Sequence, residues 1–143
     1  MYKNIFFFVV LLLTKTSSFS GDFKGAKKIK FLNYPDCIEL KNSAGTTAVL
    51  SHHVGGRVLS YRKNNKESLF IADNEREWKP DGSKKPSSAG RFDIGPEYLI
   101  PKRKELWSGK WTSTIIGPRS ARLESKESKD AGIRLIREFI LDE

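Results

Sequence analysis

The 143-residue chain has little cysteine, methionine and proline: one Cys, one Met and six Pro. A single Cys excludes a disulfide-stapled miniprotein and a Cys-based zinc finger, and the few prolines exclude a collagen-like chain. No apolar run reaches the ~20 residues that a membrane-spanning helix needs, which excludes a polytopic membrane protein. The chain does have 11% aromatic residues, and 26 Lys or Arg against 17 Asp or Glu, a formal charge of +9. These proportions indicate one basic globular domain, or part of one.

The N-terminus differs in composition from the rest of the chain. Residues 1–4 form a short basic segment, Ile5 to Leu13 are nine unbroken apolar residues, and Ser18 and Ser20 stand where a signal peptidase recognises small side chains. This pattern predicts a secretory signal peptide over residues 1–20 and a secreted or periplasmic protein. The apolar run is too short to span a bilayer as a helix, so we expect no stable membrane insertion after cleavage.

The next segment, residues 21–36, is predicted to be a solvated basic leader that precedes the first strand. Its lysines are Lys24, Lys27, Lys28 and Lys30. Cleavage after Ser20 removes two lysines, and the formal charge falls from +9 to +7. This charge would suit an anionic polymer, which remains an alternative partner. The chain carries no known nucleic-acid motif, and export separates it from most nucleic acid, so we expect no nucleic-acid partner.

Residues 37–143 consist of short segments with strand composition separated by turn residues. They predict an all-β domain, an antiparallel β-sandwich with little or no helix. The predicted strands are 37–41, 46–52, 57–62, 68–71, 111–116, 120–125 and 133–141. Cys37 in the first strand is interpreted as a small buried hydrophobe. Gly55-Gly56 predicts a bulge or a sharp bend at a sheet corner, and residues 79–90 predict an exposed loop.

The last predicted strand, residues 133–141, is half apolar on both faces. This pattern and its β-branched residues favour a strand covered on both sides over a short helix. The strand ends two residues before the end of the sequence, without a turn or a polar tail. We therefore expect a truncated domain that associates through exposed apolar side chains when it is expressed alone. The alternative is that this strand forms the edge of a small, complete sandwich.

Several blocks of residues resemble a known family. Cys37 to Asn42, Val54 to Tyr61 and Asn65 to Phe70 resemble the opening strands of galactose mutarotase-like (aldose 1-epimerase-like) proteins. Gly90 to Glu97 and Leu106 to Trp111 are similar to an uncharacterised, secreted bacterial branch of that superfamily. The resemblance implies a β-supersandwich whose concave face binds sugars, with its N-terminal half present in this chain. It also implies that carbohydrate is the partner and that the intact protein, if an enzyme, is an aldose 1-epimerase-like isomerase.

Exchange of sugar anomers needs a general base and a general acid. In the family a Glu and a His act as this base and acid. Neither maps onto a position of this sequence, so the catalytic residues stay unassigned. His52 and His53 are neighbours on a predicted strand, where side chains alternate between opposite faces, so the two could not share a metal ion. We expect structural roles for both, no metal site and no cofactor. The chain alone is predicted to be inactive.

Five residues in the later blocks are candidates for sugar binding: Arg91, Asp93, Glu97, Trp107 and Trp111. Arg91 and Asp93 share one face of a short predicted strand, where a guanidinium donates to hydroxyl groups and a carboxylate accepts from them. The two tryptophans flank a predicted tight turn and offer flat apolar faces to a pyranose. The alternatives are a structural salt bridge for the first pair and core packing for the tryptophans.

A secreted glycoside hydrolase module is a further functional alternative. Such enzymes use two carboxylates, about 5–5.5 Å apart in retaining enzymes and further apart in inverting ones. Asp93, Glu97 or Glu105 would supply the pair. The sequence itself gives no separation between these groups.

Overall fold

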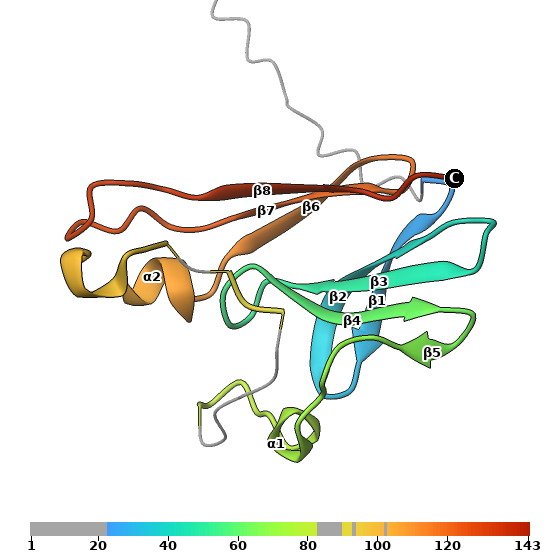
Figure 1. The fold of residues 1–143 in the computed structure, drawn as a ribbon, viewed down its shortest axis with the longest axis horizontal. Coiled ribbons are helices and arrows are strands. Elements are labelled where there is room, and N and C mark those ends of the chain that lie inside the picture. The colour runs from blue at the N-terminus through green and yellow to red at the C-terminus, as the bar shows by residue number, and fades with distance from the viewer. Residues whose placement is uncertain (1–22, 83–89, 93, 102) are drawn as a thin grey trace, which may run out of the picture.

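The strands of the protein form two antiparallel sheets, in a computed structural model that describes residues 23–82, 90–92, 94–101 and 103–143. Sheet A has the order β1-β2-β3-β4-β5 and sheet B the order β6-β7-β8, and Figure 1 shows the two as separate layers. The fold is therefore an all-β antiparallel sandwich, which confirms the predicted fold class. The predicted signal peptide, residues 1–20, lies outside the described residues, as do residues 83–89 of the predicted loop.

Sheet A is a meander in which each strand pairs with the next along the chain. Its strands are β1 (Ala26–Phe31), β2 (Tyr34–Lys41), β3 (Thr46–Ser51), β4 (Arg57–Lys63) and β5 (Lys66–Glu67). Leu40 lies opposite Ala26 on one side and Ala48 on the other, so three apolar side chains share one face across three strands. This register follows from the alternation of apolar and polar residues along β2.

Sheet B follows the helical segments. Its strands are β6 (Thr112–Gly117), β7 (Ser120–Glu124) and β8 (Ile136–Ile140). The helices are α1 (Asp73–Arg76), the 3-10 turn η1 (Glu97–Leu99) and α2 (Lys104–Trp107). Each has only three or four residues, and the described part of the chain contains no helix that is long and apolar enough to cross a membrane.

The main core fills the space between the two sheets. Sheets A and B contact each other through β1 with β6 and β2 with β7. The buried side chains of this core are Ala26, Ile38, Leu40, Ala48, Leu50, Trp111, Ala121 and Leu123. Burying each leucine or isoleucine of this core stabilises the fold by roughly 1.5–3 kcal/mol. The sandwich is therefore held by the facing surfaces of two sheets.

A second core lies on the opposite face of sheet A. It contains Tyr34, Cys37, Val49, Leu59 and Trp78. The rings of Tyr34 and Trp78 are stacked with their centroids 4.2 Å apart. Trp78 follows α1, so this cluster attaches the α1 segment to the sheet (Figure 1). The expected burial of Cys37 is confirmed, since its side chain is 0% exposed.

The first strand begins inside the predicted leader, so the prediction that residues 21–36 precede all strands was wrong. β1 covers Ala26–Phe31 and β2 starts at Tyr34. β1 is the edge strand of sheet A, and among its residues only Ala26 is buried. An edge strand of this kind tolerates exposed lysines, and Lys27 pairs with Glu39 on β2 at 3.3 Å. The apolar alternation that identifies a strand is therefore weak in β1.

Of the other predicted strands, one is absent from the structure and the last is markedly shorter. Residues 68–71 are not a strand, because the Glu67 carboxylate accepts the backbone N–H groups of Ser68 and Leu69 and so occupies donors that a ladder would need. β8 covers Ile136–Ile140 rather than residues 133–141. Ile133 makes only an isolated bridge to Ser128 at the end of the β7–β8 connection.

Candidate functional site

Gly55 and Gly56, which we call the glycine corner, lie in the connection between β3 and β4. The N–H of Gly55 donates to the carbonyl of Gly109 at 2.7 Å. A Cβ on Gly56 would lie 2.5 Å from ring atoms of Trp111, closer than real Cβ atoms approach other atoms. The corner therefore packs directly against the segment between α2 and β6, and a side chain at Gly56 would separate them. The predicted bend at this glycine pair is confirmed.

A third segment meets β4 next to the glycine corner. The N–H of Val58 donates to the carbonyl of Gly90 at 3.1 Å. Gly90 has a φ of +83°, and a Cβ there would overlap the Val58 carbonyl. Three segments that are far apart in the chain, around Gly55, Gly90 and Gly109, are thus brought together at one end of sheet A.

Arg91 and Trp107 meet at this junction. The guanidinium carbon of Arg91 lies 4.9 Å from the centroid of the Trp107 ring, within the range of a cation–π interaction. Trp107 is the last residue of α2 and is 44% exposed. Burial lowers the pKa of Arg91, and the positive charge of Arg57 lowers it further. The site therefore combines a guanidinium with an indole that solvent reaches.

Arg137 of β8 approaches the same corner from sheet B. Its guanidinium lies 4.9 Å from the ring centroid of Phe92 and 4.8 Å from that of Phe139, and it donates to the carbonyl of Gly56. Burial lowers the pKa of Arg137. Phe92 is 41% exposed. Arg137 thus links the glycine corner, the segment after Gly90 and sheet B.

A buried ionic cluster lies at the start of β4. Arg57 donates to Oε1 of Glu75 at 2.5 Å, and the hydroxyl of Tyr34 donates to Oε2 of the same carboxylate at 2.5 Å. Burial raises the pKa of Tyr34, and the hydrogen bond to Glu75 and that group's negative charge raise it further. All three side chains are at most 1% exposed. This cluster fixes α1 to sheet A and is too deep to contact a ligand itself.

The two histidines lie side by side, and the prediction that they point to opposite faces was wrong. β3 ends at Ser51, so strand alternation does not extend to them. Their ring centroids are 4.2 Å apart with an angle of 30° between the planes. Nδ1 of His52 lies 3.0 Å from the Ser113 hydroxyl, and Nε2 of His53 lies 2.6 Å from the Pro35 carbonyl. Burial, followed by the positive charge of His53, lowers the pKa of His52 to about 4.

The structure separates the predicted site residues. It brings Arg91 and Trp107 together, but Trp111 is 2% exposed, and its indole N–H donates to the Glu105 carbonyl at 3.0 Å. Trp111 is therefore a core residue, and the prediction that it stacks on a sugar was wrong.

Two further candidates are the predicted carboxylates. Asp93 and the side chain of Glu97 lie outside the described residues. Arg91 and Asp93 were expected to share one face of a short strand. The described residues 90–92 are not in a strand. Among the five candidates, Arg91 and Trp107 therefore define the site.

Sequence reasoning missed Phe92 and Arg137. Phe92 directly follows Arg91, and an aromatic residue beside a candidate arginine was the available signal. Arg137 stands in a segment with apolar residues on both faces, where a charged residue signals a specific partner. Neither signal identifies the glycine corner, because the contacts join segments distant in sequence.

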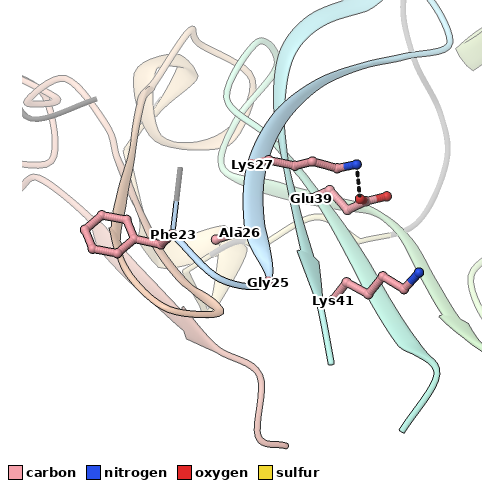
Figure 2. A pocket seen from close by; sticks show the side chains of 6 residues that line it. All are labelled: Phe23, Gly25, Ala26, Lys27, Glu39 and Lys41. Atoms are coloured by element: carbon pink, nitrogen blue, oxygen red, sulfur yellow. Dashed lines mark ion pairs between the residues drawn. The ribbon is translucent and has the colours of Figure 1, made fainter. Parts of the chain in front are cut away.

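A hollow of about 310 Å³ lies at the edge of sheet A (Figure 2). Its lining residues are Phe23, Gly25, Ala26, Lys27, Glu39 and Lys41. Figure 2 shows Lys27, Glu39 and Lys41 extending to one side and Phe23 to the other, so the aromatic ring does not face the charged groups. This hollow offers less to a sugar than Arg91 and Trp107 do. The described residues contain no cluster of three or more His, Cys, Asp or Glu that could hold a metal ion.

Comparison of the chain with protein-family models, curated proteins and solved structures finds no match. The resemblance to galactose mutarotase-like proteins therefore stays a prediction from the motif residues. Any function assigned to this chain rests on the chemistry of its own surface, above all on Arg91 and Trp107 beside the glycine corner.

Proposed function

We propose that the protein binds carbohydrate beside the glycine corner, through Trp107 and Arg91. The observation that supports this is the position of the Arg91 guanidinium, 4.9 Å from the centroid of an indole that is 44% exposed. The indole offers a flat apolar surface to the C–H face of a pyranose. The guanidinium offers N–H donors in a fixed plane to neighbouring hydroxyl groups.

Backbone hydrogen bonds hold the chain segment that carries Trp107 in place before a ligand arrives. The N–H groups of Ser108 and Gly109 both donate to the carbonyl of Lys104, at 2.9 and 2.7 Å, and so close the end of α2. The carbonyl of Gly109 in turn accepts the N–H of Gly55. A side chain carried by such a closed turn loses less conformational freedom on binding, which favours affinity.

The aromatic surface extends beyond Trp107. Phe92, next in sequence to Arg91, is 41% exposed, and the Arg137 guanidinium lies against its ring. Two exposed rings and two guanidinium groups therefore occur where residues 90–92 meet the corner. This combination suits a ligand with both C–H faces and hydroxyl groups.

The proposal is for recognition, not for catalysis by this chain alone. Anomer exchange requires an acid and a base that both reach the sugar. Glu75 is 1% exposed and cannot do so. Nδ1 of His52 is engaged with the Ser113 hydroxyl and Nε2 of His53 with the Pro35 carbonyl. Polarimetry with fresh glucose and galactose should show no acceleration, and an acceleration lost in His52→Ala or His53→Ala would contradict this.

A glycan panel followed by calorimetry tests the binding proposal. Trp107→Ala and Arg91→Ala should each weaken the affinity for the glycan identified, by about two- to tenfold, because each removes one contact type worth roughly 0.5–1.5 kcal/mol. Trp107→Phe should retain part of the affinity. Phe70→Ala removes another aromatic side chain, 70% exposed and lying outside the corner, and should leave affinity unchanged. Equal affinity in all four variants would place the site elsewhere.

A further inference from the structure

Within the described part of the chain, β8 is an edge strand with an open side. It stands at the end of the order β6-β7-β8. The N–H of Ser125 donates to the carbonyl of Leu135, and the N–H of Leu141 donates to the carbonyl of Arg119, each at 3.0 Å, so the odd-numbered residues direct their backbone groups toward β7. Because these groups alternate in an antiparallel strand, Ile136 and the other even-numbered residues direct theirs to the open side.

The outer side chains of this edge alternate between apolar and charged. Ile136 and Ile140 are 50% and 73% exposed. Glu138 between them pairs with Arg122 at 2.5 Å, and Arg134 pairs with Glu124 at 2.7 Å. Along the open edge the outer face therefore presents a cation, an isoleucine, an anion and a second isoleucine in turn.

We propose that β8 pairs with β8 of a second copy of this chain, antiparallel, about a two-fold axis at Ile136. In this register Ile136 faces the partner's Ile136, and Arg134 faces the partner's Glu138 on both sides of the axis. Within each chain Arg134 already pairs with Glu124, and Glu138 with Arg122. Pairing of the two strands therefore forms a row of alternating charges across the interface: Glu124, Arg134, the partner's Glu138 and the partner's Arg122. Opposite charges directly across two strands stabilise the pairing.

Charge also favours this register over several others. Residues that lie opposite each other must place their side chains on the same face of the sheet. The register can therefore change only by moving the two-fold axis from one residue to another. An axis at Glu138 places two carboxylates opposite each other, and an axis at Arg137 places two guanidinium groups opposite each other. An axis at Phe139 places Asp142 opposite the partner's Ile136. An axis at Glu138 also sets Arg134 opposite the partner's Asp142, but with the two carboxylates at its centre. The axis at Ile136 pairs Arg134 with the partner's Glu138 twice and opposes no like charges between residues 133 and 141.

The inner face supports the same register. A hollow of about 340 Å³ opens between the sheets beside β8, and Val58, Phe139 and Leu141 contribute to its lining. With the axis at Ile136, the partner's Ile133 lies opposite Phe139, at the mouth of this hollow. Ile133 is 39% exposed in the single chain. Pairing therefore brings apolar surface to both faces of the extended sheet.

Sedimentation equilibrium of the purified protein tests the pairing. We expect a reversible dimer in the unsubstituted chain. Ile136→Arg places two guanidinium groups opposite each other and should abolish the dimer. Ile116→Arg changes an isoleucine that is 41% exposed on β6, the other edge of the same sheet, and should retain it. A monomer at every concentration, or a dimer that survives Ile136→Arg, would overturn the proposal.

Two single substitutions test the register. Arg134→Glu and Glu138→Arg each place like charges opposite each other twice, and each variant alone should dimerise about tenfold more weakly. An equimolar mixture restores both unlike pairs in a heterodimer and should recover the original affinity. Thermal melts confirm that each variant is folded. A mixture that associates as weakly as its components would show that the register is wrong.

Discussion

The guanidinium of Arg57 donates to the carboxylate of Glu75 across 2.5 Å, and both side chains are only 1% exposed. The pair joins β4 to α1 and connects residues that are 18 positions apart in the chain. The hydroxyl of Tyr34 completes the cluster by donating to the second carboxylate oxygen at 2.5 Å. In a low-dielectric interior, removal of one charge leaves the other without compensation, which costs more than the intact pair contributes.

Glu75→Ala should therefore lower the free energy of unfolding by about 3–5 kcal/mol. Urea denaturation followed by far-ultraviolet circular dichroism measures this change. Glu127→Ala removes an exposed carboxylate and should change the stability by less than about 0.5 kcal/mol. If both variants unfold at the same urea concentration, the buried pair does not hold α1 to the sheet.

The stability should decrease as the pH is lowered, because of His52. Its pKa is about 4 in the folded protein, against an ordinary value of 6.5. As the pH drops below 6.5, the unfolded chain binds a proton at His52 that the folded chain does not, so the free energy of unfolding decreases until the pH reaches about 4. Above 6.5 this residue contributes no pH dependence.

Urea denaturation between pH 7 and pH 5 isolates this effect, because most carboxylates remain ionised there. His52→Asn should flatten the profile over that interval. The ring resonances of His52 in the folded protein should titrate with a midpoint near 4. A midpoint near the ordinary value would mean that burial does not suppress its charge.

Gly90→Ala should destabilise the protein through backbone strain and through a steric clash. The φ of +83° disfavours a Cβ, and the added atom would overlap the Val58 carbonyl. We expect a loss of about 1–3 kcal/mol, typical of overpacking. Gly82→Ala is the matched control, because its φ is +76° and a Cβ there meets nothing within 4 Å. An equal loss in both variants would show that only the backbone strain matters.

The sequence predicted those strands in which apolar alternation is strong and pairing is local. Cys37 to Lys41 and Thr46 to Ser51 form the predicted hairpin because their alternate residues fill two cores. β1 was missed because its one buried residue, Ala26, is small and its turn uses Leu32 at a φ of +53°, which no turn propensity indicates. Tertiary pairing with β2 overrides the weak local signal.

The candidate site was only partly predictable for a related reason. Residue type identifies Arg91 and Trp107 as suited to sugars, but their contact depends on Gly90 lying against Val58 and on Gly55 lying against Gly109. Trp111 is a tryptophan like Trp107 and is equally suited to a sugar by residue type, but its side chain is buried in the core. Burial is set by the packing of two sheets, which local sequence patterns do not encode.

Cys37 should be inert in the folded protein although it is the only cysteine. Its side chain is 0% exposed, and burial raises the pKa of the thiol to about 11, so the reactive thiolate is scarce at pH 8. A thiol-specific disulfide reagent should therefore label the native protein no faster than global unfolding allows, and should label it at once in guanidinium chloride. In an oxidising compartment the same burial keeps an unpartnered cysteine from forming a disulfide with another chain. Rapid stoichiometric labelling of native protein would show that β2 opens locally, in conflict with a core that includes Tyr34 and Val49.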